Sequence, residues 1–184
     1  MRPARKLPPP AWSKSKGRQD TSHPSTLLGT GKTQVINRHK RYRVNEKLIK
    51  KIVSKILKYI RKPRDTELEV VFLDDGSIRP INKAYKRRDA PTDVLSFKLD
   101  VAEFGSRKFL GEIFISIDRA KENSRAFKAD FKEEVVLYVI HGILHLFGYD
   151  DEDAESRRRM SKKEKETLRY LCKREDLSKV LTPL

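Results

Sequence analysis

Two histidines four residues apart, His141 and His145, lie in an apolar stretch that has the spacing of a helix. A spacing of four brings two side chains onto one helical face, with Cβ atoms about 5 to 6 Å apart. Both imidazoles can then bind one metal ion. Gly148 ends the helical pattern, and a left-handed glycine at this point would turn the chain back. A third ligand, Asp150 or Asp151, could therefore reach the same ion, and Asp151 is the better placed.

The full pattern H-x3-H-x2-G-x2-D indicates a catalytic zinc site. The alternative is that both histidines are satisfied core residues and that the aspartates only solvate the next helix. An imidazole without a partner on an apolar helix would be costly, which favours the metal. Three protein ligands leave one coordination position open, as catalytic zinc sites do. The single cysteine, Cys172, is far from the motif in the sequence.

Hydrophobic periodicity and turn signals predict eight elements of secondary structure around this motif. They are helices over 45–61, from 77, over 118–128, from 130 and over 154–173, and strands over 67–73, 92–99 and 110–117. This order predicts an α+β fold in which a small mixed β-sheet packs with helices. The metal site would lie at the C-terminal end of a central helix.

Several local features follow from the same patterns. Ser77 is a candidate N-cap, with Pro80 in the first turn of its helix, where a missing N–H costs nothing. The last helix would contact the core through Met160, Leu168 and Leu171. The stretch over 101–109, which mixes polar and aromatic residues, is expected to be a loop.

Charge and composition restrict the partners. The 184 residues include 42 Lys and Arg against 26 Asp and Glu, a net charge of +16. This balance favours a polyanionic partner such as nucleic acid, although a basic solvated surface would have the same composition. No apolar run approaches the ~20 residues of a membrane span, so no membrane is expected. A single cysteine excludes an internal disulfide framework and fits a reducing compartment.

The first 34 residues differ from the rest of the chain. They hold five of the nine prolines, seven basic residues and a single acid, Asp20. We expect residues 1–34 to form a disordered basic tail that adds nonspecific RNA affinity, followed by a single domain over 35–184. Because the tail also resembles an acid-poor transit peptide, the expected location is the cytoplasm or, alternatively, an organelle stroma or matrix.

The chain resembles the YbeY family of ribosomal-RNA maturation endoribonucleases over most of residues 35–173. The segments that carry the resemblance are HGILHLFGYDD, RRDAPTDVLSF and LGEIFIS. The resemblance implies a metal-dependent, single-strand-specific endoribonuclease that acts in ribosome assembly, notably at the 3′ end of 16S rRNA. It implies one Zn²⁺ held by three histidines: His141 and His145 match two of them, and Asp151 stands at the third position. The implied partners are single-stranded RNA, ribosomal RNA and the small ribosomal subunit, with neither membrane nor DNA.

A basic segment upstream of the motif carries the other candidate site residues. Lys86 stands where the family usually has an important arginine, and Glu112 replaces a common aspartate. We interpret Lys86 as a candidate catalytic residue that stabilises charge in the transition state. The alternative is an ordinary solvated lysine. Arg87 and Arg88 are candidate RNA-binding residues that would contact phosphates without reading the base sequence.

Two other functions are compatible with the motif. Zinc proteases of the metzincin type use the same ligand spacing, but they place a glutamate general base directly after the first histidine. This chain has Gly142 there, and glycine can neither accept a proton nor orient water. A noncatalytic ribosome assembly factor that uses metal only for stability is also compatible with the departures at Lys86 and Asp151.

Overall fold

The computed structural model describes residues 33–63, 66–98, 103–104 and 107–184. The predicted tail therefore lies almost wholly outside the described residues, and its disorder stays a prediction. The first strand, β1 (Gln34–Asn37), starts one residue before the predicted start of the domain. In this described part of the chain, no helix combines the length and the apolar character needed to cross a membrane.

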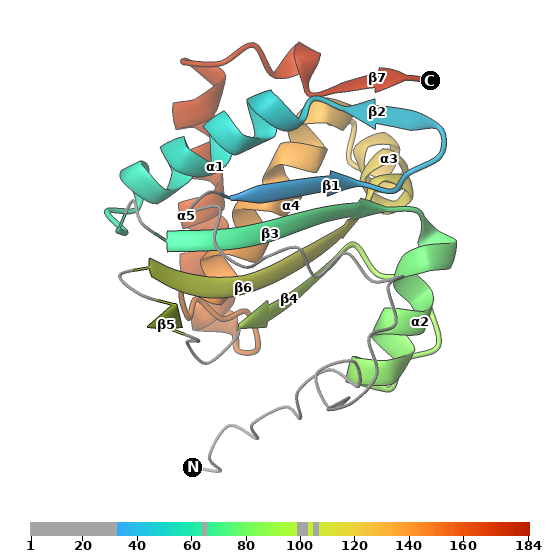
Figure 1. The fold of residues 1–184 in the computed structure, drawn as a ribbon, viewed down its shortest axis with the longest axis horizontal. Coiled ribbons are helices and arrows are strands. Elements are labelled where there is room, and N and C mark those ends of the chain that lie inside the picture. The colour runs from blue at the N-terminus through green and yellow to red at the C-terminus, as the bar shows by residue number, and fades with distance from the viewer. Residues whose placement is uncertain (1–32, 64–65, 99–102, 105–106) are drawn as a thin grey trace. The chain divides into compact units, whose positions relative to one another are not determined.

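A mixed β-sheet forms the centre of the fold (Figure 1). Its strands, in spatial order, are β1, β3 (Thr66–Leu73), β6 (Arg107–Ser116) and β4 (Val94–Lys98), with β5 (Glu103–Phe104) also paired to β6. The first three are parallel, whereas β4 and β5 run antiparallel to β6. A separate antiparallel pair joins β2 (Tyr42–Val44) to β7 (Leu181–Pro183). The small mixed sheet predicted from the sequence is confirmed.

Helices pack on both faces of this sheet (Figure 1). They are α1 (Glu46–Tyr59), α2 (Asp75–Lys86), α3 (Ile117–Ala126), α4 (Phe131–Leu146) and α5 (Ala154–Cys172), with a short 3-10 turn, η2 (Leu177–Lys179). Alternation along β3 sends Leu68, Val70 and Phe72 into the core that α1 and α4 complete. Val71 and Leu73 point to the other face, where Ile78 of α2 packs on them. The predicted α+β class is confirmed.

The start of α2 differs from the prediction. Asp74, not Ser77, is the N-cap, and its Oδ1 accepts a hydrogen bond from the Ser77 backbone N–H at 2.7 Å. Asp74 follows β3 directly, so capping there lets Ile78 reach the sheet while the helix is still in its first turns. Pro80 therefore lies inside α2 and not in its first turn, on an exposed position.

Short or long-range strand pairings account for the other differences. The segment over 101–109, predicted to be a loop, contains β5 and the start of β6. β1, β2 and β7 have three or four residues each, too few for a periodic signal, and they depend on partners distant in the sequence. In α5, Met160 and Leu171 are buried as predicted, but Leu168 is only half-buried.

Two glutamates face each other inside the sheet. Glu69 of β3 and Glu112 of β6 are register partners on neighbouring parallel strands, and both are buried. Burial raises the pKa of Glu69, although the charge of Arg38 opposes this. Burial, and then the charge of Glu69, raise the pKa of Glu112 to about 7. The sheet therefore holds Glu112 partly protonated at neutral pH.

We expect Glu112 to make the domain less stable as pH rises from about 4.5 to about 7. Its pKa is higher in the folded state, so in this window the folded chain binds more protons than the unfolded chain, and deprotonation favours unfolding. The loss from Glu112 should be about 3 kcal/mol in the free energy of unfolding. Urea denaturation below and above the window measures the pH dependence, and Glu112→Gln should reduce it by that amount. An unchanged slope in that variant would assign the effect to other groups.

Candidate metal centre

The helix α4 carries both histidines and is anchored at each end by its own sequence. Asp130 caps the N-terminus, where its Oδ1 accepts hydrogen bonds from the backbone N–H groups of Lys132 and Glu133. At the other end Gly148 has φ 85°, the left-handed conformation that glycine adopts without strain. The predicted helix and its glycine end are therefore confirmed, and the chain turns back toward the last turn of α4.

Packing against the sheet requires a glycine at position 142, between the two histidines. A Cβ atom at Gly142 would lie 2.4 Å from Cγ2 of Ile113 on β6, far inside van der Waals contact. Ile113 is fully buried, so it has little room to move. The position that metzincin-type proteases give to a glutamate therefore faces the sheet here and has no space for a side chain. The structure thus adds a steric reason against the protease function.

Three side chains converge at the C-terminal end of α4. The Nε2 atoms of His141 and His145 lie 3.0 Å apart, and Asp151 Oδ1 lies 3.9 Å from His145 Nε2. One ligand atom from each of these residues falls within 4.8 Å of the others. Tetrahedral zinc with bonds of about 2.0 to 2.1 Å separates its ligand atoms by about 3.3 Å. The three residues thus fit a single ion with small adjustments of the half-exposed Asp151.

The two aspartates after Gly148 have different roles. Asp150 Oδ1 accepts hydrogen bonds from the backbone N–H groups of Asp151 and Glu152, at 2.7 and 3.3 Å. Such a side chain to backbone bond shapes the turn itself. Asp151, in contrast, directs its carboxylate toward His145. The structure therefore brings Asp151 to the histidines and uses Asp150 to form the loop that places it.

Glu164 of α5 is hydrogen-bonded to one of the two histidines and orients it. Glu164 Oε1 lies 2.7 Å from His141 Nδ1, so Nδ1 donates to it and Nε2 keeps a free lone pair toward the ion. Burial lowers the pKa of His141, but the hydrogen bond and charge of Glu164 outweigh burial and leave the pKa raised. Burial and the neighbouring His141 lower the pKa of His145. Glu164 thus fixes the tautomer and ring orientation that metal binding requires.

Further acidic groups surround the histidines. Asp93, from the loop before β4, raises the pKa of His141 through its charge, after the larger effects of burial and Glu164. Glu134 lies on the same side of α4, is buried, and is hydrogen-bonded to Tyr138. Burial raises the pKa of Glu134, and the charges of Asp93 and Glu164 add to this. An acidic cluster of this kind attracts a cation, and it repels a phosphate group when no cation is bound.

A family model described as endoribonuclease YbeY matches residues 34–172, which include the three converging residues and Glu164. The chain belongs to this family. Two curated relatives, both described as endoribonuclease YbeY, illustrate the similarity. One from Geobacter metallireducens is 36% identical over 145 residues, covering 76% of this chain and 95% of the relative. One from Aquifex aeolicus is 47% identical over 88 residues, covering 48% of this chain and 58% of the relative.

A solved structure agrees with this assignment. The solution structure of a Thermotoga maritima protein is similar to this chain with a TM-score of 0.52 and 29% sequence identity. The similarity covers 74% of this chain and 86% of that protein.

The basic candidates lie at the C-terminal end of α2. Lys86 is its last residue, Arg87 caps it with φ 58°, and both are exposed, as is Arg88. Within the described residues no hydrogen bond or ion pair links Lys86 to the three converging residues, so its catalytic role stays a prediction. The loop that begins at Arg87 continues to Asp93, which does act on His141.

Neighbouring side chains hold this basic loop in shape. Asp89 pairs with Arg79 and Lys83 at 2.8 and 2.7 Å, and these hydrogen bonds lower its pKa to about 2. The buried Asn82 donates from Nδ2 to the Ala90 carbonyl at 2.8 Å. The RRDAP segment is therefore tied back to α2, which presents Arg87 and Arg88 to solvent at a defined place.

Sequence reasoning did not identify Glu164, Asp93 or Glu134 as parts of the centre. A helical projection of α5 offers one signal, because Glu164 projects at the border between the buried Leu171 and the exposed Arg157. Glu134 offers no distinct signal, because the helix dipole favours an acid in the first turn of α4 whether or not a metal is nearby. Asp93 carries no periodic signal, since its proximity depends on the path of a loop.

Proposed function

We propose that this protein is a zinc-dependent, single-strand-specific endoribonuclease that processes ribosomal RNA, including the 3′ end of 16S rRNA, during assembly of the small ribosomal subunit. The observation that carries this proposal is the convergence of His141, His145 and Asp151, with Glu164 behind them, in a chain of the YbeY family. The proposal places the protein where ribosomes are assembled, in the cytoplasm or, if the tail is a transit peptide, in an organelle.

The three converging residues suit a divalent ion by type and by geometry. Two imidazoles and one carboxylate form a donor set found in zinc hydrolases and also in iron(II) sites. A bound ion would supply positive charge against a non-bridging phosphate oxygen at the cleaved bond. The protein's own contribution is to hold the donors rigidly, since α4 is packed on the sheet and Glu164 orients His141.

Turnover of an unstructured single-stranded RNA, with a chelator control, tests the proposal directly. We expect the RNA to be cut by the wild type, to be spared after chelation, and to be cut again when zinc is returned. The matched duplex should be cut much more slowly. If the metal-loaded wild type binds the RNA without cutting it, the protein is a noncatalytic assembly factor. Cleavage that persists in the absence of metal would exclude the metal-dependent mechanism.

Lys86 and Arg88 should affect different steps of cleavage. If Lys86 stabilises charge in the transition state, Lys86→Ala should lower kcat by about tenfold or more with little change in RNA affinity. Arg88→Ala, the matched control on the same loop, should raise KM and leave kcat nearly unchanged. Single-turnover kinetics measures both values. Equal losses of kcat and affinity in Lys86→Ala would make Lys86 a binding residue, and no loss would return it to the solvated surface.

A further inference from the structure

The acidic surroundings of the metal centre require cations elsewhere to hold an RNA strand. Asp93, Glu134 and Glu164 all act on the groups around His141, so phosphates away from the ion meet negative charge there. Binding of a polyanion beside such an acidic cluster requires Lys or Arg side chains that are exposed and free to make contacts. The helix α5, which contributes Glu164, also carries a dense set of such side chains.

Five cations of α5 lie on one side of the helix. These residues, here called the α5 basic stripe, are Arg157, Arg158, Lys162, Lys165 and Arg169, and all are exposed. At about 100° per residue they occupy an arc of about 140°. Glu164 projects only about 20° from Arg157, at the edge of the stripe. The stripe therefore begins on the side of α5 that faces the metal centre. The same helix thus contributes residues to both the stripe and the centre.

The acids of α5 border this stripe and do not interrupt it. Glu155 and Glu166 project about 20° and 40° beyond Lys162, and Glu155 pairs there with Arg159 at 2.7 Å. Many cations elsewhere are paired too: Lys51 and Lys55 share Glu175, while Arg79 and Lys83 share Asp89. Within the described residues the α5 basic stripe makes no ion pair. Its charges are thus available to an external partner.

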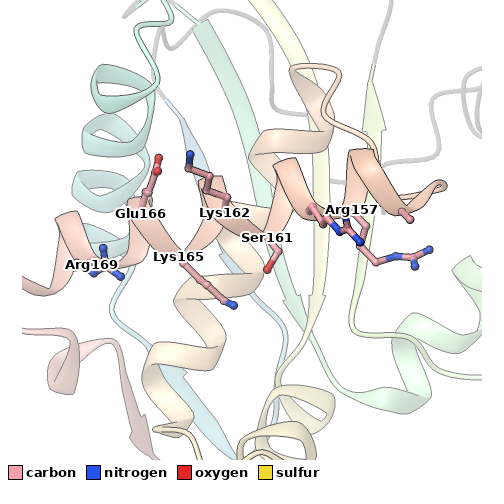
Figure 2. A pocket seen from close by; sticks show the side chains of 8 residues that line it. Arg157, Ser161, Lys162, Lys165, Glu166 and Arg169 are labelled. Atoms are coloured by element: carbon pink, nitrogen blue, oxygen red, sulfur yellow. The ribbon is translucent and has the colours of Figure 1, made fainter.

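The stripe also has the shape of a strand-binding surface. Figure 2 shows its side chains projecting from one helix, and the lining residues of the open surface there all belong to α5. Glu166 is the one acid among the described lining residues. Positions four residues apart are separated by about 6 Å along a helix, so the stripe presents a cation at nearly every step over about 18 Å. Such a row suits successive phosphates of one extended strand.

We propose that the α5 basic stripe binds the phosphate backbone of the single-stranded RNA substrate and leads it past the metal centre. The inference rests on the proposed function, because it takes RNA as the partner. Contacts to phosphates carry no base information, so the stripe would supply affinity without sequence preference. It would do this from the side of the centre formed by α5, in addition to the predicted contacts of Arg87 and Arg88.

The test removes charge from the stripe while keeping the helix. Lys162→Gln, Lys165→Gln and Arg169→Gln are combined in the full chain, because glutamine is a good helix former. The control combines Lys47→Gln, Lys50→Gln and Lys58→Gln, three exposed lysines of α1, for the same loss of net charge. Fluorescence anisotropy with a labelled oligouridine of about 12 nucleotides is recorded at several salt concentrations on chelator-treated protein, so that no cleavage interferes.

We expect the stripe variant to bind at least about tenfold more weakly at 0.1 M salt, and the slope of log K against log salt to fall by about two. The control should stay within about threefold of the wild type. In cleavage assays the stripe variant should show a raised KM and an unchanged kcat. Metal content and melting temperature should match the wild type in both variants.

Three outcomes would overturn the inference. The first is a stripe variant that binds RNA as tightly as the wild type. The second is a control variant that loses as much RNA affinity as the stripe variant. The third is a stripe variant that loses binding to anionic lipid vesicles while it keeps RNA binding. The last result would assign the surface to a membrane. A wild type that binds RNA through the stripe but never cleaves it would contradict the proposed function alone, so the two failures are distinguishable.

Discussion

His141→Ala and His145→Ala should each purify with less than about a tenth of a metal ion per chain, against about one in the wild type. Each change removes one of two imidazoles whose Nε2 atoms lie 3.0 Å apart, and a remaining histidine with one half-exposed carboxylate binds weakly. Elemental analysis after expression with added zinc measures the content and identifies the ion. Glu164→Gln should weaken binding by only about 10- to 100-fold, since it removes an orienting partner and not a ligand.

Two controls separate metal loss from damage to the fold. Cys172→Ser removes an exposed thiol outside the centre and should leave the metal content unchanged. The melting temperature of His145→Ala should be close to that of the wild type after chelation, because both lack the stabilisation by bound metal. His141→Ala should melt a few degrees lower, because it also leaves Glu164 without its partner. Full metal content in both histidine variants would contradict the assigned centre. A melting temperature far below that of the chelated wild type would indicate a packing defect.

Asp151→Ala should lower zinc affinity by more than about 100-fold, beyond the cost of losing an outer partner, while Asp150→Ala should change it only a few-fold. Asp151 directs its carboxylate to the histidines, whereas Asp150 bonds to the backbone of the turn. Competition with a chromophoric zinc chelator measures both affinities. Asp151→His gives the three-histidine set that the resemblance implies, so it should keep zinc and reduce tolerance for manganese, which prefers oxygen ligands.

The paired aspartate variants give a clear decision on the third ligand. Loss of affinity in Asp150→Ala with full affinity in Asp151→Ala would show that the loop rearranges on metal binding and that Asp150 is the ligand. If neither change matters, the centre has two protein ligands only. The melting temperature of the metal-free forms should be nearly equal for Asp151→Ala and the wild type, because Asp151 is half-exposed and packs little.

Local sequence patterns were sufficient for the framework of the centre. The spacing of His141 and His145 places them on one face of any α-helix, whatever surrounds it. Asp130 and Gly148 mark the two ends of that helix through capping and left-handed backbone, which depend on neighbouring residues alone. The helix predicted over 45–61 was equally legible, since its apolar residues repeat with the helical period; all of them except the half-buried Leu48 and Tyr59 are buried.

Contacts between distant segments decided the rest. Glu164 reaches His141 because α5 packs on α4, and a separation of 23 residues leaves no periodic trace of that pairing. Gly142 is needed because α4 lies directly on Ile113 of β6, a distance that only the assembled sheet sets. Likewise, the choice between Asp150 and Asp151 depended on which of the two carboxylates is hydrogen-bonded to the backbone of the turn and which stays available to a metal ion. Types and spacings thus determined which residues could bind a metal, and the packing of α4 between β6 and α5 decided how they are oriented.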